Sequence, residues 1–91
     1  MQLLPDMESA MDVVKVYGTT WCGDCNRAKA FMDEHNVDYE WTNVDEETEF
    51  VELVLQINNG QRRVPTIVFP DGSVLVEPSN ADLAEKLTLE L

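Results

Sequence analysis

The sequence predicts one α/β domain in which elements follow the order β-α-β-α-β-β-α, forming a four-stranded mixed sheet flanked by three helices. Three observations support this prediction. A β-branched run at residues 13–17 leads into a helical pattern at 26–35, a second such pair follows at 38–57, and a hairpin pattern at 66–76 precedes a capped helix. A right-handed strand-helix-strand unit makes the first two strands parallel, and the hairpin adds antiparallel strands.

The first strand and helix flank both cysteines. Residues 13–17 form a β-branched and aromatic run that is typical of a buried strand. The following helix is expected to end with Asn36 as its C-cap, and His35 is expected to interact with the helix dipole rather than with a ligand. Its apolar positions recur at the spacing of one helical face, at Ala28, Phe31, Met32 and His35.

The second strand and helix follow directly. Residues 38–44 alternate between polar and apolar side chains, which predicts a half-buried strand. The acidic run at 45–49 places negative charge where the second helix is expected to begin, and the helix should end at 58–60. An apolar stripe marks this helix at Phe50, Leu53, Val54 and Ile57.

The last third of the chain predicts a hairpin and a final helix. Residues 66–69 and 74–76 read as strands joined by a tight turn at 70–73. Ser79 and Asp82 have the spacing of a capping box, so a helix should begin there. Its inner side is expected to carry Leu83, Leu87 and Leu91.

Charge and hydropathy exclude several partner classes. The chain has 91 residues and a formal net charge of -12, from 18 acidic and 6 basic side chains. Phosphate binding needs clustered positive charge, so nucleic acids and anionic membranes are not expected partners. No apolar run approaches the roughly 20 residues that span a bilayer, and residues 1–11 lack the features of a signal peptide. We expect a cytoplasmic monomer with an N-terminal extension at 1–11 and one domain at 12–91.

The chain's only two cysteines, Cys22 and Cys25, lie at the first strand-to-helix junction. A helix beginning at residue 22 brings unpaired backbone N–H groups and the positive dipole end to the first sulfur, which favours a thiolate. One helical turn brings the second sulfur within disulfide reach. Asp24 opposes ionisation of the first thiol, which favours a reductant over an oxidant. In a reducing compartment such a pair is typically catalytic or metal-binding.

The element order, the sequence WCGDC at 21–25 and the Val64-Pro65 pair before the third strand together resemble the glutaredoxin branch of the thioredoxin fold. Within that branch the chain looks most like the mycoredoxins, which are small reductases that work with mycothiol. The similarity covers about residues 12–89. It implies a thiol-disulfide oxidoreductase that reduces mixed disulfides between proteins and a small thiol, and protein disulfides as a further substrate. Cys22 would be the attacking nucleophile and Cys25 the resolving thiol.

The resemblance also implies a substrate-binding surface. Pro65 would be a cis-proline beside the sulfurs, and the backbone of Val64 would pair with an extended thiol substrate. Asn80 is a further substrate-binding candidate. Trp21 is either a platform for the substrate or a packing residue. The adjacent basic residues Arg62 and Arg63 either steer a thiol substrate or offset the acids of the second helix.

Departures from the glutathione-dependent pattern bear on the co-substrate. Pro78-Ser79 stand where these glutaredoxins usually have Gly-Gly, and Thr19 stands where they often have a basic residue. Gly23-Asp24 replace the common Pro or aromatic residue between the cysteines. The first two departures, together with the acidic net charge, favour mycothiol, a sugar-linked thiol without a carboxylate, over glutathione as the co-substrate, with no tightly bound cofactor. The third departure bears on the redox potential of the pair.

Two other functions remain open at this point. Two chains could share an iron–sulfur cluster or zinc through Cys22 and also Cys25. Two cysteines cannot supply four ligands, so a dimer or an external thiol would have to supply the rest. Alternatively, the dithiol could receive its electrons from a flavin-dependent thioredoxin reductase rather than from a small thiol.

Overall fold

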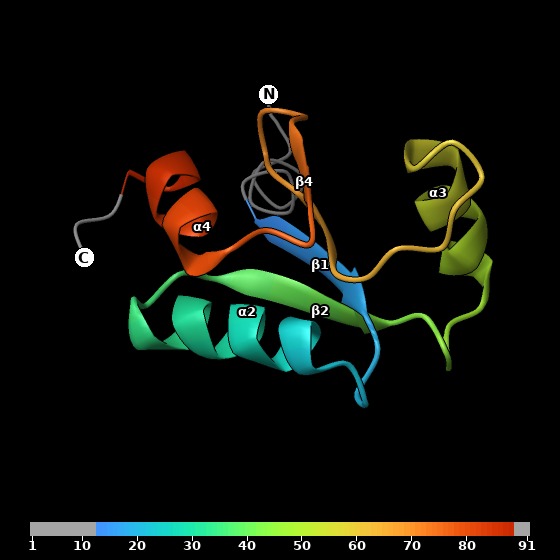
Figure 1. The fold of residues 1–91 in the computed structure, drawn as a ribbon, viewed down its shortest axis with the longest axis horizontal. Coiled ribbons are helices and arrows are strands. Elements are labelled where there is room, and N and C mark those ends of the chain that lie inside the picture. The colour runs from blue at the N-terminus through green and yellow to red at the C-terminus, as the bar shows by residue number, and fades with distance from the viewer. Residues whose placement is uncertain (1–12, 89–91) are drawn as a thin grey trace, which may run out of the picture.

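A four-stranded mixed sheet in the order β2-β1-β3-β4 forms the centre of the computed structural model, which describes residues 13–88 (Figure 1). Strand β1 (Val14–Gly18) pairs in parallel with β2 (Tyr39–Asn43). On its other side, β1 pairs with β3 (Thr66–Val68) in the antiparallel direction, and β3 pairs in the same way with β4 (Val74–Val76). The predicted mixed sheet and the element order are confirmed.

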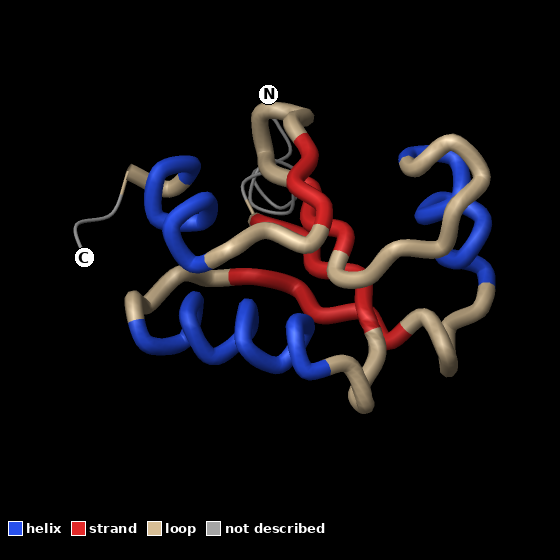
Figure 2. Tube along the Cα trace, in the orientation of Figure 1, coloured by secondary structure: helices blue, strands red, loops and turns tan. Residues whose placement is uncertain are grey.

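Three helices within residues 13–88 cover the two faces of this sheet. Helices α2 (Gly23–Glu34) and α4 (Asn80–Lys86) pack on one face, and α3 (Glu49–Ile57) packs on the other. Figure 2 shows α3 on the opposite side of the strands from α2 and α4. None of the helices between residues 13 and 88 is long and apolar enough to cross a membrane.

Two apolar clusters result from the alternation of side chains along the central strand. Val16 and Tyr17 are neighbours on β1 and therefore point to opposite faces. The larger cluster lies under α2 and α4 and contains Val14, Val16, Ala28, Phe31, Met32, Ile67, Phe69, Leu83 and Ala84. The smaller one lies under α3 and contains Tyr17, Val44 and Val54, with Phe50 and Leu53 packed against it.

Helix α2 begins earlier than its apolar pattern does. Cys22 is the N-cap and Gly23 the first helical residue, which agrees with a helix that begins at the first cysteine. At the other end the C-cap is His35, so the expectation that Asn36 caps the helix is wrong by one position. Asn36 instead has φ of 58°, the left-handed conformation that commonly follows a C-cap. The Nδ1 atom of His35 lies 2.9 Å from the Phe31 carbonyl oxygen, within the last helical turn.

Helix α3 begins later than the acidic run suggested. Its N-cap is Thr48 and its first residue is Glu49, so residues 45–47 lie outside the helix. The reason is a turn at the end of β2 that uses their backbone amides. The N–H of Asp45 donates to the Asn43 side chain at 3.0 Å, and the next two amides donate to the Asn43 carbonyl oxygen.

The start of α4 confirms the predicted capping box. The N–H of Asp82 donates to Ser79 Oγ, and the N–H of Ser79 donates to Asp82 Oδ2, both at 3.1 Å. Leu83, on the inner side of this helix, is fully buried. The predicted inner position Leu91 and the N-terminal extension at 1–11 lie outside the described residues.

Candidate active site

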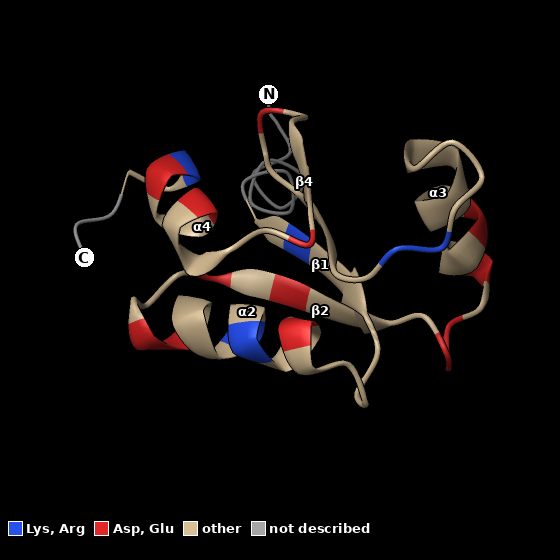
Figure 3. Cartoon of the chain, viewed as in Figure 1, with Lys and Arg blue, Asp and Glu red and all other residues tan. Residues whose placement is uncertain are grey.

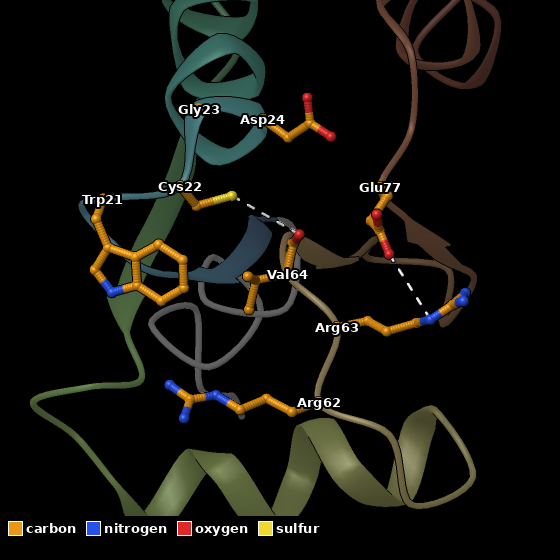
Figure 4. Close-up of a pocket in the computed structure, with 8 residues that line it drawn as sticks. All are labelled: Trp21, Cys22, Gly23, Asp24, Arg62, Arg63, Val64 and Glu77. Atoms are coloured by element: carbon orange, nitrogen blue, oxygen red, sulfur yellow. Dashed lines mark hydrogen bonds and ion pairs between the residues drawn. The ribbon is translucent and has the colours of Figure 1, made fainter.

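The sulfur of Cys22 caps helix α2. The backbone N–H of Cys25 donates a hydrogen bond to Cys22 Sγ at 3.2 Å, so the sulfur occupies the place of a capping oxygen. On its other side, the Cys22 thiol lies 3.8 Å from the carbonyl oxygen of Val64, to which it donates (Figure 4). The helix N-terminus thus offers an N–H group and its positive dipole end to this sulfur, which stabilises negative charge there.

Cys25 has a different environment. Its side chain is fully buried, whereas Cys22 is only half-buried, and both cysteines are free thiols. Burial, and after it a hydrogen bond with Cys22, raise the pKa of Cys25 to about 12. This sulfur lies against β1, because a Cβ atom placed on Gly18 would be 2.5 Å from Cys25 Sγ. The site therefore contains one accessible thiol, Cys22, and one buried thiol, Cys25.

The peptide bond between Val64 and Pro65 is cis, as the resemblance implies. It presents the Val64 carbonyl oxygen to Cys22. Pro65 itself is fully buried, and its carbonyl oxygen accepts a hydrogen bond from the N–H of Glu77 at 2.9 Å. The segment before β3 is therefore connected to the active-site sulfur on one side and to the end of β4 on the other.

A pocket of about 600 Å³ lies in front of the Cys22 sulfur (Figure 4). Five of the predicted site residues line it together, with three residues that were not predicted as site residues. The complete lining consists of Trp21, Cys22, Gly23, Asp24, Arg62, Arg63, Val64 and Glu77. The indole of Trp21 borders this pocket with an exposed fraction of 72%, so it does not pack in the core.

Asn80 does not line this pocket. It lies in a neighbouring pocket of about 400 Å³, together with Arg27, Pro78 and Ser79. The two pockets share Asp24 and Glu77, so they are continuous along one side of the active site. The amide oxygen of Asn80 is already occupied, since it accepts a hydrogen bond from Arg27.

The arginines around the two pockets all have acidic partners. Arg62 pairs with Asp45, within the acidic run that the charge-offset interpretation named. Arg63 lies 3.7 Å from Glu77, which is outside that run, and Arg27 lies 3.7 Å from Asp24. Figure 3 shows the basic segment before β3 between acidic segments of the chain. The pairs reduce the positive field that a substrate would meet.

Asp45 is the main residue that sequence reasoning did not assign to the site. One carboxylate oxygen accepts a hydrogen bond from Trp21 Nε1 at 2.7 Å, and the other accepts from Arg62. These two hydrogen bonds lower the pKa of Asp45, the bond from Trp21 more strongly. Asp45 therefore connects the segment before α2 to the segment before β3. No local pattern could reveal this contact, because Trp21 is 24 positions away.

Among residues 13–88, no group of three or more His, Cys, Asp or Glu side chains is placed to hold a metal ion. The reactive feature of the site is its pair of free thiols. A half-buried sulfur at a helix N-terminus, with a second thiol one turn later, can exchange disulfides with a substrate in the pocket.

Comparison with known proteins agrees with this chemistry. A family model described as Glutaredoxin matches residues 14–75. A Mycobacterium tuberculosis protein with glutaredoxin in its name is 36% identical over 72 residues, which is 79% of this chain and 86% of the relative. Mycoredoxin 1 of Corynebacterium glutamicum is 32% identical over 77 residues, covering 85% of this chain and 95% of the relative.

Solved structures give the same result. The crystal structure of a glutaredoxin from Archaeoglobus fulgidus superposes with a TM-score of 0.72 at 26% identity, covering 90% of this chain and 92% of the other. The matched family model extends from β1 to β4 and so includes both cysteines and the Val64-Pro65 segment. Together with the thiol geometry, these similarities show that the chain belongs to the glutaredoxin family and is a thiol-disulfide oxidoreductase of the thioredoxin fold.

Proposed function

We propose that the protein reduces mixed disulfides between proteins and a low-molecular-weight thiol, with mycothiol favoured over glutathione. The observation that carries this proposal is the position of Cys22. Its sulfur lines the pocket, receives the Cys25 amide at the start of α2, and faces the Val64 carbonyl oxygen. The Cys25 amide and the N-terminus of α2 favour negative charge on this sulfur, and the pocket leaves it open to a substrate.

The first step is attack by the Cys22 thiolate on the small-thiol sulfur of the mixed disulfide. A disulfide forms between Cys22 and the small thiol, and the protein substrate leaves as a thiolate that takes a proton from water. The second step clears this intermediate. Either a second small thiol attacks it, which releases a small disulfide, or Cys25 attacks Cys22 and releases the small thiol.

The substrate would dock along the segment before β3. We propose that the backbone of Val64 pairs with the extended substrate as an added strand, a mode in which main-chain hydrogen bonds supply affinity. Trp21 would serve as the platform for the substrate, since its indole is exposed beside the sulfur and is held by Asp45. Arg62 and Arg63 would border the entry of the pocket.

The preference for mycothiol rests on charge. The three arginines around the pockets are paired with Asp24, Asp45 and Glu77. At the start of α4, the Ser79 amide is taken by the Asp82 carboxylate, which fills a place where an incoming carboxylate could bind. A carboxylate-bearing thiol such as glutathione would therefore bind less favourably than a neutral sugar-linked thiol.

We further propose that the protein works as a cytoplasmic monomer. Electrons would come from the small thiol itself, or from a flavin-dependent reductase acting on the oxidised dithiol. Coupled NADPH assays run in parallel with mycothiol, glutathione and a thioredoxin reductase distinguish these donors.

Two cysteine variants test the reaction. Cys22→Ser should abolish reduction of a protein–mycothiol mixed disulfide, because it removes the nucleophile. Cys25→Ser should retain this activity and lose reduction of protein disulfides. Wild-type rates in the Cys22→Ser protein would refute the proposed reaction, and equal rates with glutathione and mycothiol would refute the preference between the two thiols.

A further inference from the structure

The buried sulfur of the resolving thiol, Cys25, lies against Gly18, next to the indole of Trp41. A Cβ atom on Gly18 would lie 2.5 Å from Cys25 Sγ and 3.0 Å from two ring carbons of Trp41. The sulfur and the indole therefore share the space that Gly18 leaves open above β1. Because Trp41 pairs with Val16 on the neighbouring strand, its side chain lies on the sheet face that α2 covers.

A single lysine lies on the same indole. The Nζ atom of Lys29 is 3.6 Å from the centre of the Trp41 ring, a cation–π contact. Lys29 is one helical turn after Cys25 on α2, so the two side chains lie on the same side of the helix. The indole thus holds an ammonium group near a sulfur that is sealed from solvent.

Buried thiols resist ionisation, and Cys25 has to ionise when it acts as a nucleophile. The groups that act on its charge are few. Cys22 opposes ionisation, a backbone hydrogen bond with Thr19 favours it, and Lys29 is the cation that favours it. In the proposed reaction Cys25 clears the intermediate, and its thiol must lose a proton to do so.

We propose that Lys29, held on the indole of Trp41, is the cation that supports the Cys25 thiolate when this thiol attacks the mixed disulfide on Cys22. Trp41 is the positioning residue for that cation. The inference rests on the proposed function, because it concerns the second step of the same reaction.

The step balances without a further reactant. Cys25 gives its proton to water, and its sulfur attacks Cys22 Sγ. The Cys22–Cys25 disulfide forms while the bond from Cys22 to the small thiol breaks. The small thiol leaves as a thiolate with the electron pair and takes a proton from water. Lys29 keeps its proton throughout.

Dithiodipyridine, a neutral disulfide that releases a coloured thione, separates the two steps in one trace. Attack by Cys22 releases one thione, and attack by Cys25 on the resulting intermediate releases a second. A Cys25→Ser protein shows the first release alone and so assigns the phases. Lys29→Met should slow the second phase by roughly three- to tenfold and leave the first unchanged, as expected for loss of a nearby, partly solvated charge.

Two matched variants test whether the effect depends on a positive charge at position 29 in particular. Lys29→Arg keeps the charge and should restore most of the second-phase rate. Lys15→Met removes the same charge from β1, where strand alternation points the side chain away from α2, and should leave both phases unchanged. Circular dichroism and the urea midpoint of each variant show whether the fold is intact.

The inference is overturned if Lys29→Met leaves the second phase unchanged, or if it slows both phases equally. It is also overturned if Lys29→Arg is as slow as Lys29→Met while both are folded. These phases are observed without any mixed-disulfide substrate. A wild-type protein that shows both phases but does not reduce protein mixed disulfides would therefore refute the proposed function and not this inference.

Discussion

Cys22 and Cys25 are three positions apart and have opposite surroundings. Cys22 lines an open pocket and caps helix α2, while Cys25 is fully buried between the helix and β1. The first sulfur shares its pocket with exposed side chains such as Trp21, and the second lies against Gly18. The contrast shows that one helical turn is enough to assign different tasks to identical side chains, because only one of them reaches solvent.

The largest effect is expected from closing the space around the buried sulfur. Gly18→Ala places a methyl group 2.5 Å from Cys25 Sγ and against the Trp41 ring. Such overpacking should lower the free energy of unfolding by about 1–3 kcal/mol. Urea denaturation of the reduced protein measures this. The matched control is Gly23→Ala, whose Cβ would contact nothing within 4 Å. Equal free energies of unfolding for the two variants would mean that the space around the Cys25 sulfur is not tightly packed.

The burial of Cys25 should make the folded protein less stable at alkaline pH. An unfolded cysteine ionises near pH 8.5, whereas burial raises the pKa of Cys25 to about 12 in the folded protein. Between these values the unfolded state loses a proton that the folded state keeps, so stability falls as pH rises. This part of the slope, about 1 kcal/mol per pH unit, should be absent in Cys25→Ala. Urea midpoints under reducing conditions at increasing pH measure it, and identical slopes would contradict the buried-thiol assignment.

A smaller effect is expected at the open side. Asp45→Asn removes the ion pair with Arg62 and weakens the hydrogen bond from Trp21 Nε1. These contacts are exposed and therefore weak, so we expect a roughly two- to fivefold rise in KM for the mixed-disulfide substrate with little change in kcat. Asp71→Asn removes an acid that pairs with Lys86 at the other end of the molecule and serves as control. A fall in kcat with unchanged KM would mean that Asp45 acts on the sulfur itself.

The smallest effect is expected from removing the acidic partner of Arg63. Glu77→Gln releases Arg63 from an exposed pair with a separation of 3.7 Å, a contact worth well under about 1 kcal/mol. The rate with a glutathione mixed disulfide should rise by roughly twofold relative to a neutral one. Competition between the two substrates in one reaction gives this ratio directly. If Arg63→Gln gives the same change in ratio as Glu77→Gln, local charge at this pocket does not select the thiol.

Most of the fold could be predicted because its signals are local. The alternation of Val16 and Tyr17 assigns the two sheet faces, and Ser79 with Asp82 marks the start of α4. The predicted start of α3 is wrong because Asn43 accepts hydrogen bonds from the backbone amides of residues 45–47, which therefore form a turn. A pattern of charged residues does not show these hydrogen bonds.

The site divides in the same way. The two cysteines and the Val64-Pro65 pair could be found from spacing and resemblance. The roles of Asp45 and Glu77 depend on contacts between segments that are distant in sequence, with 24 positions between Trp21 and Asp45. Such pairs are set by the sheet order, which brings the ends of β1, β2 and β4 to one edge of the pocket. Linear periodicity carries no information about them.

Gly23 offers a way to redesign this protein. It is the first residue of α2, where proline is favoured, and its surroundings leave room for a side chain. The residue between two cysteines influences how the reduced and oxidised forms are balanced, and about 30 mV in such a couple corresponds to about 1.4 kcal/mol. A panel of substitutions at position 23 could therefore produce reductants of graded strength on one unchanged scaffold.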